Sequence, residues 1–384
     1  MAKLTRRFLV CSAASLGLAK AGRASSANTK PPAPPIVPAH IGVALPRTGI
    51  YALQGDEVFR GIQLAVDAVN AGAGVAGQKI QMISMDMPSQ ASAATVVNEL
   101  VMTDNANILF GSGSSALSYP ATAAAELAQT PFIELNAPAD GIVSRGFKYL
   151  LRIGPTTGMI GQLAAATVAS RYPQRRLGLL FNTGATAGAI AVATINALKM
   201  AKQPVTLSIA YPEDANSLFV QVGRLMRAGV EVLLHAAGVD DSLALFEAMQ
   251  NLSWRPTALI GCGEGYELRD TQEALGAALN GTLVIGAPFY PGLAADLKLT
   301  YEAKYGVPPR SADSCTAYVG AKLVFDTLDA VQGDASKLLG ALRQLVLPKD
   351  ALINGFGVDF DENGQNRASF VTLQNWRGGA LTPL

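Results

Sequence analysis

The chain has 384 residues, of which 49% are hydrophobic and 15% charged, and its formal net charge at pH 7 is +1. This length exceeds what one hydrophobic core usually serves, so two lobes are expected. A nearly neutral chain gives no electrostatic basis for binding nucleic acid, and the composition is that of a globular, water-soluble protein. Two histidines and no Cys-x-x-Cys spacing give no metal-binding pattern, so neither a metal nor another cofactor is expected.

The N-terminal segment 1–27 has the composition of an export signal peptide. Basic residues, including the adjacent Arg6 and Arg7, precede the mildly apolar run 8–19, and small residues lead to the expected cleavage point. The paired arginines favour the twin-arginine route, with the Sec route as the alternative. Segment 28–38 contains five prolines and is typical of a stiff linker. The mature protein is therefore predicted to be soluble in the periplasm.

The first part of the mature chain alternates apolar strands with helices. Val58, Ile62 and Val69 recur at helical spacing, and Asp56 with Glu57 suits the positive end of that helix. The patterns predict strands over 41–45, 80–86, 107–110 and 132–135, and helices over 56–71, 91–103 and 115–128.

The same alternation then begins again and ends in a different kind of tail. The tail has two apolar runs, 356–360 and 368–376, around the polar turn 361–364, which predicts a β-hairpin. The preceding part predicts strands over 176–181, 205–210, 231–235, 258–261 and 282–285, and helices over 159–171, 188–201, 217–228, 241–252, 293–305 and 313–330.

Two sets of repeated strand–helix units predict the class of fold. Such units form parallel sheets covered by helices on both faces, so two sets indicate two doubly wound α/β lobes. Ligands of these sheets bind beyond the carboxyl ends of the strands. Cys262 and Cys315 remain after signal removal, and we expect two free, partly buried thiols, with a disulfide as the alternative.

One strand-to-helix turn, Gly111–Leu117 (GSGSSAL), carries much of the functional information. Its glycines let the backbone approach a ligand, and its amides and serine hydroxyls suit a carboxylate or another small anion. The turn also fits G-x-G-x-x-A, with Glu134 about 20 residues later, so an NAD(P)-dependent oxidoreductase is a remote alternative. Against it, two β–α units precede the motif and Pro120 interrupts the next helix. His235 closes an apolar strand and is interpreted as a core histidine, not as a catalytic base.

These residues resemble the leucine/isoleucine/valine-binding family, the type I periplasmic substrate-binding proteins of ABC transporters. The strongest stretch is 41–86, with P-x-T-G at Pro46–Gly49, and the resemblance continues through GSGSSALSYPA and a C-terminal GFGVDFDENGQ. It implies two lobes joined by a three-strand hinge that closes on one ligand, and no enzymatic activity. The implied lobes are 39–155 with 287–368, and 156–286 with 369–384.

The resemblance also places the ligand site, residue by residue. Ser115 matches the serine that holds a ligand carboxylate, although an ordinary helix N-cap is the alternative for this residue. Pro138 stands at a usual threonine position and cannot donate a hydrogen bond. Ala187 and Gly238 replace two enclosing tyrosines, for which Tyr266 is a possible substitute. The full predicted set is Tyr51, Gln54, Ser114, Ser115, Asn136, Ala137, Pro138, Thr157, Ala187, Gly238 and Glu264.

Two ligand classes stay open at this point. Loss of two large rings leaves room for an aromatic or extended carboxylic acid, whereas an amino acid fits if Glu264 faces the pocket and binds an ammonium group. The implied partner is an ABC transporter membrane permease, and a monomer is expected. A sensor lobe that reports to a signalling protein is the alternative function.

Overall fold

A computed structural model describes residues 38–384, which belong to one compact unit. The predicted signal peptide and all but the last residue of the predicted linker lie outside the described residues. No helix within 38–384 combines the length and apolar character that crossing a membrane requires.

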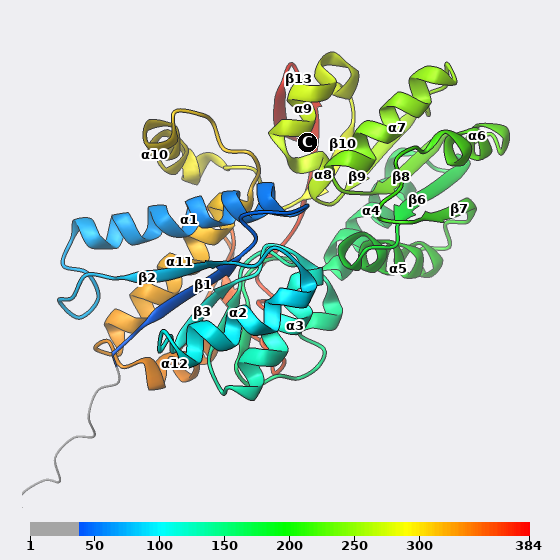
Figure 1. Ribbon diagram of the computed structural model, residues 1–384. Coiled ribbons are helices and arrows are strands. Elements are labelled where there is room, and N and C mark those ends of the chain that lie inside the picture. The colour runs from blue at the N-terminus through cyan, green and yellow to red at the C-terminus, as the bar shows by residue number, and fades with distance from the viewer. Residues whose placement is uncertain (1–37) are drawn as a thin grey trace, which may run out of the picture. The chain divides into compact units, whose positions relative to one another are not determined.

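The first sheet has five parallel strands in the order β2-β1-β3-β4-β5. Figure 1 shows α1 and α11 on one side of this sheet and α2 and α3 on the other, and a separate apolar core fills each side. The strands are β1 (Ile41–Leu45), β2 (Met82–Asp86), β3 (Ile108–Gly111), β4 (Phe132–Glu134) and β5 (Leu150–Arg152); the helices are α1 (Ala52–Ala71), α2 (Gln90–Met102), α3 (Ser115–Leu127), α10 (Ala295–Tyr305), α11 (Asp313–Ala330) and α12 (Leu338–Gln344).

The second sheet has seven strands in the order β14-β13-β10-β9-β8-β6-β7. Strands β6 to β10 are parallel, whereas β13 and β14 run antiparallel at one edge. Cores lie on both faces, one with α4 and α5 and the other with α6 and α7. The elements are α4 (Thr157–Arg171), β6 (Leu177–Asn182), α5 (Ala185–Met200), β7 (Val205–Tyr211), α6 (Phe219–Arg227), β8 (Val232–Ala236), α7 (Val239–Asn251), β9 (Ala258–Cys262), α8 (Glu264–Glu267), α9 (Arg269–Leu275), β10 (Leu283–Gly286), β13 (Thr372–Arg377) and β14 (Ala380–Pro383).

The chain passes between the two sheets three times: after β5, after β10 and before β13. The first and third passages are bonded to each other. Gln365 Nε2 donates to the Gly154 carbonyl at 3.1 Å, and Ser369 Oγ donates to the same oxygen at 3.3 Å. The architecture is thus two doubly wound α/β lobes joined by three strands of chain, as the sequence predicted.

The first helix begins earlier than predicted. It starts at Ala52, where a turn brings the Ala52 amide to the Gly49 carbonyl at 3.2 Å, so Asp56 and Glu57 lie in its second turn. Their predicted role at the positive end of the helix is therefore wrong. Asp56 pairs with Arg60 at 2.8 Å. Glu57 is buried, and burial, as the largest influence, raises its pKa despite hydrogen bonds to neighbouring hydroxyls.

The predicted hairpin in the tail forms only next to its turn. The first run pairs as β12 (Val358–Asp359) with β11 (Val346–Leu347), and the second run, β13, pairs with β14 and β10. Next to the turn, the bridge between Phe360 and Asn366 is flanked by backbone hydrogen bonds from Asp361 to Gln365 at 3.0 Å, from Arg367 to Asp359 at 2.8 Å and from Gly357 to Ala368 at 3.1 Å. The strands that β12 and β13 pair with also fit a strand pattern. Alternation of residues in the sequence alone therefore does not determine which strands pair. Cys262 and Cys315 are unpaired and buried, which confirms free thiols.

Close packing of α1 on α11 depends on Gly61. A Cβ at this position would lie 2.2 Å from the Ser314 carbonyl oxygen and 2.9 Å from Ala317 Cβ. We expect Gly61→Ala to lower the free energy of unfolding by about 1–3 kcal/mol, because the helices must move apart. Gly340→Ala on α12 is the control, since a Cβ there meets no atom within 4 Å. Chemical denaturation measures both, and equal stability of the two variants would contradict this account of the packing.

Candidate functional site

A pocket of about 550 Å³ lies where the loops after several strands meet. One wall comes from the loop after β1 and the start of α1, on the first sheet, and the opposite wall comes from loops of the second sheet. All these loops follow the carboxyl ends of parallel strands, where doubly wound sheets bind ligands. The lining segments fall within 50–54, 182–190, 213–216, 237–241 and 263–264.

Five of the predicted site residues line this pocket: Tyr51, Gln54, Ala187, Gly238 and Glu264. Tyr51 and Gln54 stand on the wall from the first sheet, and the other three follow β6, β8 and β9. Ala187, Gly238 and Glu264 were predicted from the family resemblance, and Tyr51 and Gln54 from their place in the first strand-to-helix loop. Whether they contact a ligand stays a prediction.

Ser114 and Ser115 are fully buried and lie outside the pocket lining. Ser114 is the N-cap of α3, and its hydroxyl accepts a hydrogen bond from the Ala116 amide at 3.3 Å. The alternative that made Ser115 the N-cap is therefore wrong. Ser115 Oγ instead accepts a hydrogen bond from the Ala139 amide at 3.3 Å. Both hydroxyls thus already have partners within the chain.

The second predicted segment, Asn136–Pro138, and Thr157 also lie outside this lining. Asn136 Nδ2 donates to Asp313 Oδ1 at 2.6 Å, across to the start of α11. Thr157 Oγ1 donates to Asp140 Oδ2 at 2.8 Å. Like the two serines, these side chains bond to the protein, and their predicted ligand contacts remain predictions.

Glu134 holds the two predicted segments together. Its buried carboxylate accepts hydrogen bonds from the Ser112 amide at 3.0 Å, the Ser112 hydroxyl at 2.6 Å and the Ser118 hydroxyl at 2.5 Å. The amides of Asn136 and Ala137 donate to the same carboxylate at 3.2 and 3.0 Å. The acid that the dinucleotide alternative assigned to a ribose is therefore fully engaged by the protein.

Glu264 is the most electrostatically perturbed acid in the pocket wall. Burial, followed by the negative charge of Asp313, raises the pKa of Glu264 to about 8, and a hydrogen bond from Gln54 opposes this shift. Gln54 is 4% exposed, and its Oε1 has no hydrogen-bond partner within residues 38–384. The wall thus presents an unpartnered acceptor, Gln54 Oε1, and beside it a carboxyl group that holds its proton more tightly than usual.

Sequence reasoning missed Glu213, which follows β7 in the pocket wall. Tyr51 Oη donates a hydrogen bond to Glu213 Oε1 at 3.0 Å, which joins the two walls. Burial, and then the negative charge of Glu213, raises the pKa of Tyr51. The position of Glu213 after a predicted strand was the available signal, since other pocket residues share that position.

The wall from α7 is built on a buried polar chain. Asp241, in the first turn of α7, accepts hydrogen bonds from the Gly238 amide at 2.9 Å and from Asn182 Nδ2 at 2.6 Å. Behind it, His235 lies between the hydroxyls of Tyr211 and Tyr266, at 2.7 and 2.5 Å. Burial lowers the pKa of His235 to about 3, so it is a neutral core residue as predicted. Tyr266 is fully buried and does not line the pocket.

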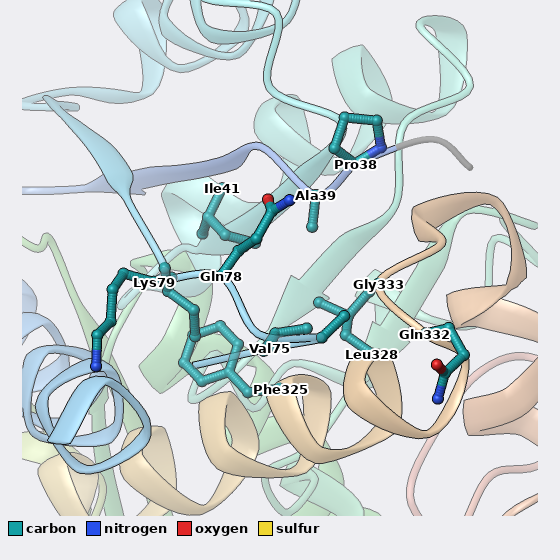
Figure 2. Close-up of a pocket in the computed structure, with 12 residues that line it drawn as sticks. Pro38, Ala39, Ile41, Val75, Gln78, Lys79, Phe325, Leu328, Gln332 and Gly333 are labelled. Carbon is teal, nitrogen blue, oxygen red and sulfur yellow. The ribbon is translucent and has the colours of Figure 1, made fainter. Parts of the chain in front are cut away.

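A second hollow, of about 370 Å³, lies between the loop before β2 and α11 (Figure 2). Figure 2 shows Phe325 and Leu328 of α11 facing it with residues of that loop. Its basic residue, Lys79, is engaged by the carbonyl oxygens of Asn70 and Gly72. Its walls are mainly apolar, and the ammonium group of Lys79 already bonds to the protein. This hollow is therefore a weaker candidate for a ligand site than the pocket between the sheets.

Two doubly wound lobes with a polar pocket at their facing strand ends define a two-lobed solute-binding fold. A family model described as periplasmic binding protein matches residues 38–380, and the chain belongs to this family. A Leu/Ile/Val-binding protein homolog 8 of Brucella suis biovar 1 (strain 1330) is 29% identical over 385 residues, covering 96% of this chain and 94% of the relative.

Solved structures share the fold at low sequence identity. A leucine-binding protein of Thermotoga maritima MSB8 superposes with a TM-score of 0.80 at 18% identity, covering 90% of this chain and 97% of that one. A solute-binding protein of an ABC transporter from Rhodopseudomonas palustris BisB5, in complex with 3,4-dihydroxybenzoic acid, gives 0.79 at 18% identity, covering 90% and 95%. The type I periplasmic binding protein fold predicted from sequence is confirmed.

Proposed function

We propose that this protein is the extracytoplasmic solute-binding component of an ABC importer. The observation that carries the proposal is the pocket between the two sheets, whose wall residues Tyr51 and Glu213 already bond across it. Family membership and neighbours that bind leucine or an aromatic acid support the same role. The solute classes carried forward are those from the sequence: an amino acid or a larger carboxylic acid.

The proposed mechanism is closure of the lobes around the solute without chemical change. The lobes are 39–155 with 287–368, and 156–286 with 369–384, and the bonded passages at Gly154 and Gln365 form part of the hinge. A solute that contacts both walls stabilises the closed form by its differential affinity, and a membrane permease then recognises that form. Export by residues 1–27, periplasmic location and a monomeric state complete the proposal.

A thermal-shift screen against amino acids and aromatic acids tests this function. A solute that binds only the native protein raises the melting temperature. Thr186→Trp should abolish the rise, because Thr186 lies on α5 in the pocket wall and an indole there fills the cavity. Val192→Trp, on the exposed side of the same helix, is the matched control and should keep the response. A rise that persists in Thr186→Trp would place binding elsewhere.

A further inference from the structure

The charge of the pocket wall is one-sided. Five acidic side chains line it, from Glu213, Asp214, Asp240, Asp241 and Glu264, and a bound cation favours the ionised form of each; within residues 38–384 the lining includes no lysine, arginine or histidine. A solute that carries only negative charge would meet repulsion from these groups and no compensating cation. The wall therefore favours solutes of the opposite charge.

An acidic side chain of the protein already stands at each of the two helix N-termini in the pocket. The N-terminus of a helix carries partial positive charge and unpaired amides, and α5 and α7 both begin at the pocket. At α7, Asp241 accepts a hydrogen bond from the Gly238 amide. At α5, Glu213 lies against the N-cap residue Gly184, where an added Cβ would be 2.4 Å from Glu213 Oε1. The Gly238 amide is therefore already bonded, and the carboxyl group of Glu213 already stands beside the N-terminus of α5.

The anion seat predicted from the sequence is engaged in the same way. Ser114 Oγ accepts from the Ala116 amide, Ser115 Oγ accepts from the Ala139 amide, and Glu134 takes the Ser112 amide. A hydroxyl that accepts a hydrogen bond keeps its own proton, so Ser114 and Ser115 could still donate to one carboxylate of a solute. Positive charge on the solute beyond that single carboxylate would be matched by the acids of the pocket wall.

An unpartnered buried side chain provides an independent indication of a ligand. Gln54 lines the pocket at 4% exposure, and its Oε1 has no partner within the described residues. A buried polar atom without a hydrogen bond costs free energy, which a donor on the solute would recover. Together with Glu213 and Glu264, it offers acceptors suited to N–H groups.

We infer that the solute carries net positive charge, with at least one protonated nitrogen bound by Glu213 and Glu264; this rests on the proposed solute-binding function. The class is an organic ammonium compound with more protonated nitrogens than carboxylates, such as a basic amino acid or an amine. Glu213 sets the charge preference from the second-sheet wall, and Gln54 accepts a further N–H from the first-sheet wall.

Calorimetric titration of the full chain with two matched pairs of probes tests the inference. Lysine and norleucine differ in side-chain charge, as do benzylamine and benzoate. In whichever pair binds, the cationic compound should bind at least about tenfold more tightly than its partner. Added sodium chloride should lower the affinity for that cation. If norleucine or benzoate binds as tightly as its cationic partner, the charge inference fails while solute binding stands. If neither pair binds, the solute that raises the melting temperature in the thermal-shift screen is used instead. A cationic solute supports the inference, and a neutral or anionic solute overturns it. If no solute raises the melting temperature, the proposed function fails as well.

Charge-removing variants locate the effect within the pocket. Glu213→Gln and Glu264→Gln should each weaken the bound cation by at least about tenfold, because each removes an ion-paired hydrogen bond. Glu247→Gln, at an exposed position on α7, is the control and should bind as the unmodified protein does. Thermal unfolding of each variant establishes that it is folded. Unchanged affinity in both pocket variants would overturn the inference.

Discussion

Replacement of Glu134 by alanine should lower the free energy of unfolding by about 3–5 kcal/mol and abolish solute binding. The carboxylate is fully buried and accepts from three backbone amides and two serine hydroxyls. Alanine leaves the three amides and the Ser118 hydroxyl without this acceptor, and the Ser112 hydroxyl keeps only the Ser114 carbonyl oxygen at 3.0 Å. The loops after β3 and β4 would then lose the group that fixes their relative position.

Urea denaturation and calorimetric titration measure the two effects of Glu134→Ala. Glu99→Ala, at an exposed position on α2, is the control and should stay within about 0.5 kcal/mol of the unmodified protein. Glu134→Gln should be intermediate, because it keeps one acceptor oxygen and turns an amide donor toward other donors. Stability of Glu134→Ala equal to that of the control would show that the network contributes little.

Glu264 should make the empty protein less stable as pH rises. Its pKa is about 8 in the folded protein against 4.5 as the reference, a shift caused first by burial and then by the charge of Asp313. The folded state therefore holds this proton more tightly than the unfolded state. The stabilisation is complete below pH 4.5 and is lost as pH rises through about 8.

The Glu264→Gln variant isolates this contribution. It should be more stable than the unmodified protein by about 2–4 kcal/mol at pH 8.5, and nearly equal to it at pH 4.5. Chemical denaturation at the two pH values, without solute, measures the difference. A constant difference across the range would mean that Glu264 titrates normally and that the wall is well hydrated.

Local patterns were enough to predict most of the fold. Helix α11 was predicted at its observed bounds, and β1 likewise, because long periodic segments specify their own structure. The tail was predicted only in part, for a physical reason: beyond the turn, β12 pairs with β11 and β13 with β10, and these pairings depend on which segments the whole fold brings together. Strand alternation carries no information about the partner.

In the candidate site, too, some residues could be predicted from the sequence, whereas contacts between separate loops could not. Tyr51 and Gln54, which line the pocket, were predicted from their place in the first strand-to-helix loop, and Glu264 from its match to an acidic position of the resembled family. That Glu213 covers the start of α5 was not visible, since the contact with Gly184 joins separate loops. Likewise, Ser115 bonds to Ala139 in the loop after β4, and Glu134 of β4 bonds to Ser112 and Ser118 after β3, so these contacts appear only in three dimensions.

Identification of retained solute by mass spectrometry tests the central claim most directly. The purified protein is incubated with a mixture of amino acids, amines and aromatic acids, separated from free solute, and denatured to release what it holds. The account predicts one solute class at about one molecule per chain, unchanged in mass, and lost from Thr186→Trp but not from Val192→Trp. Retention of nothing, or release of a chemically converted product, would contradict it.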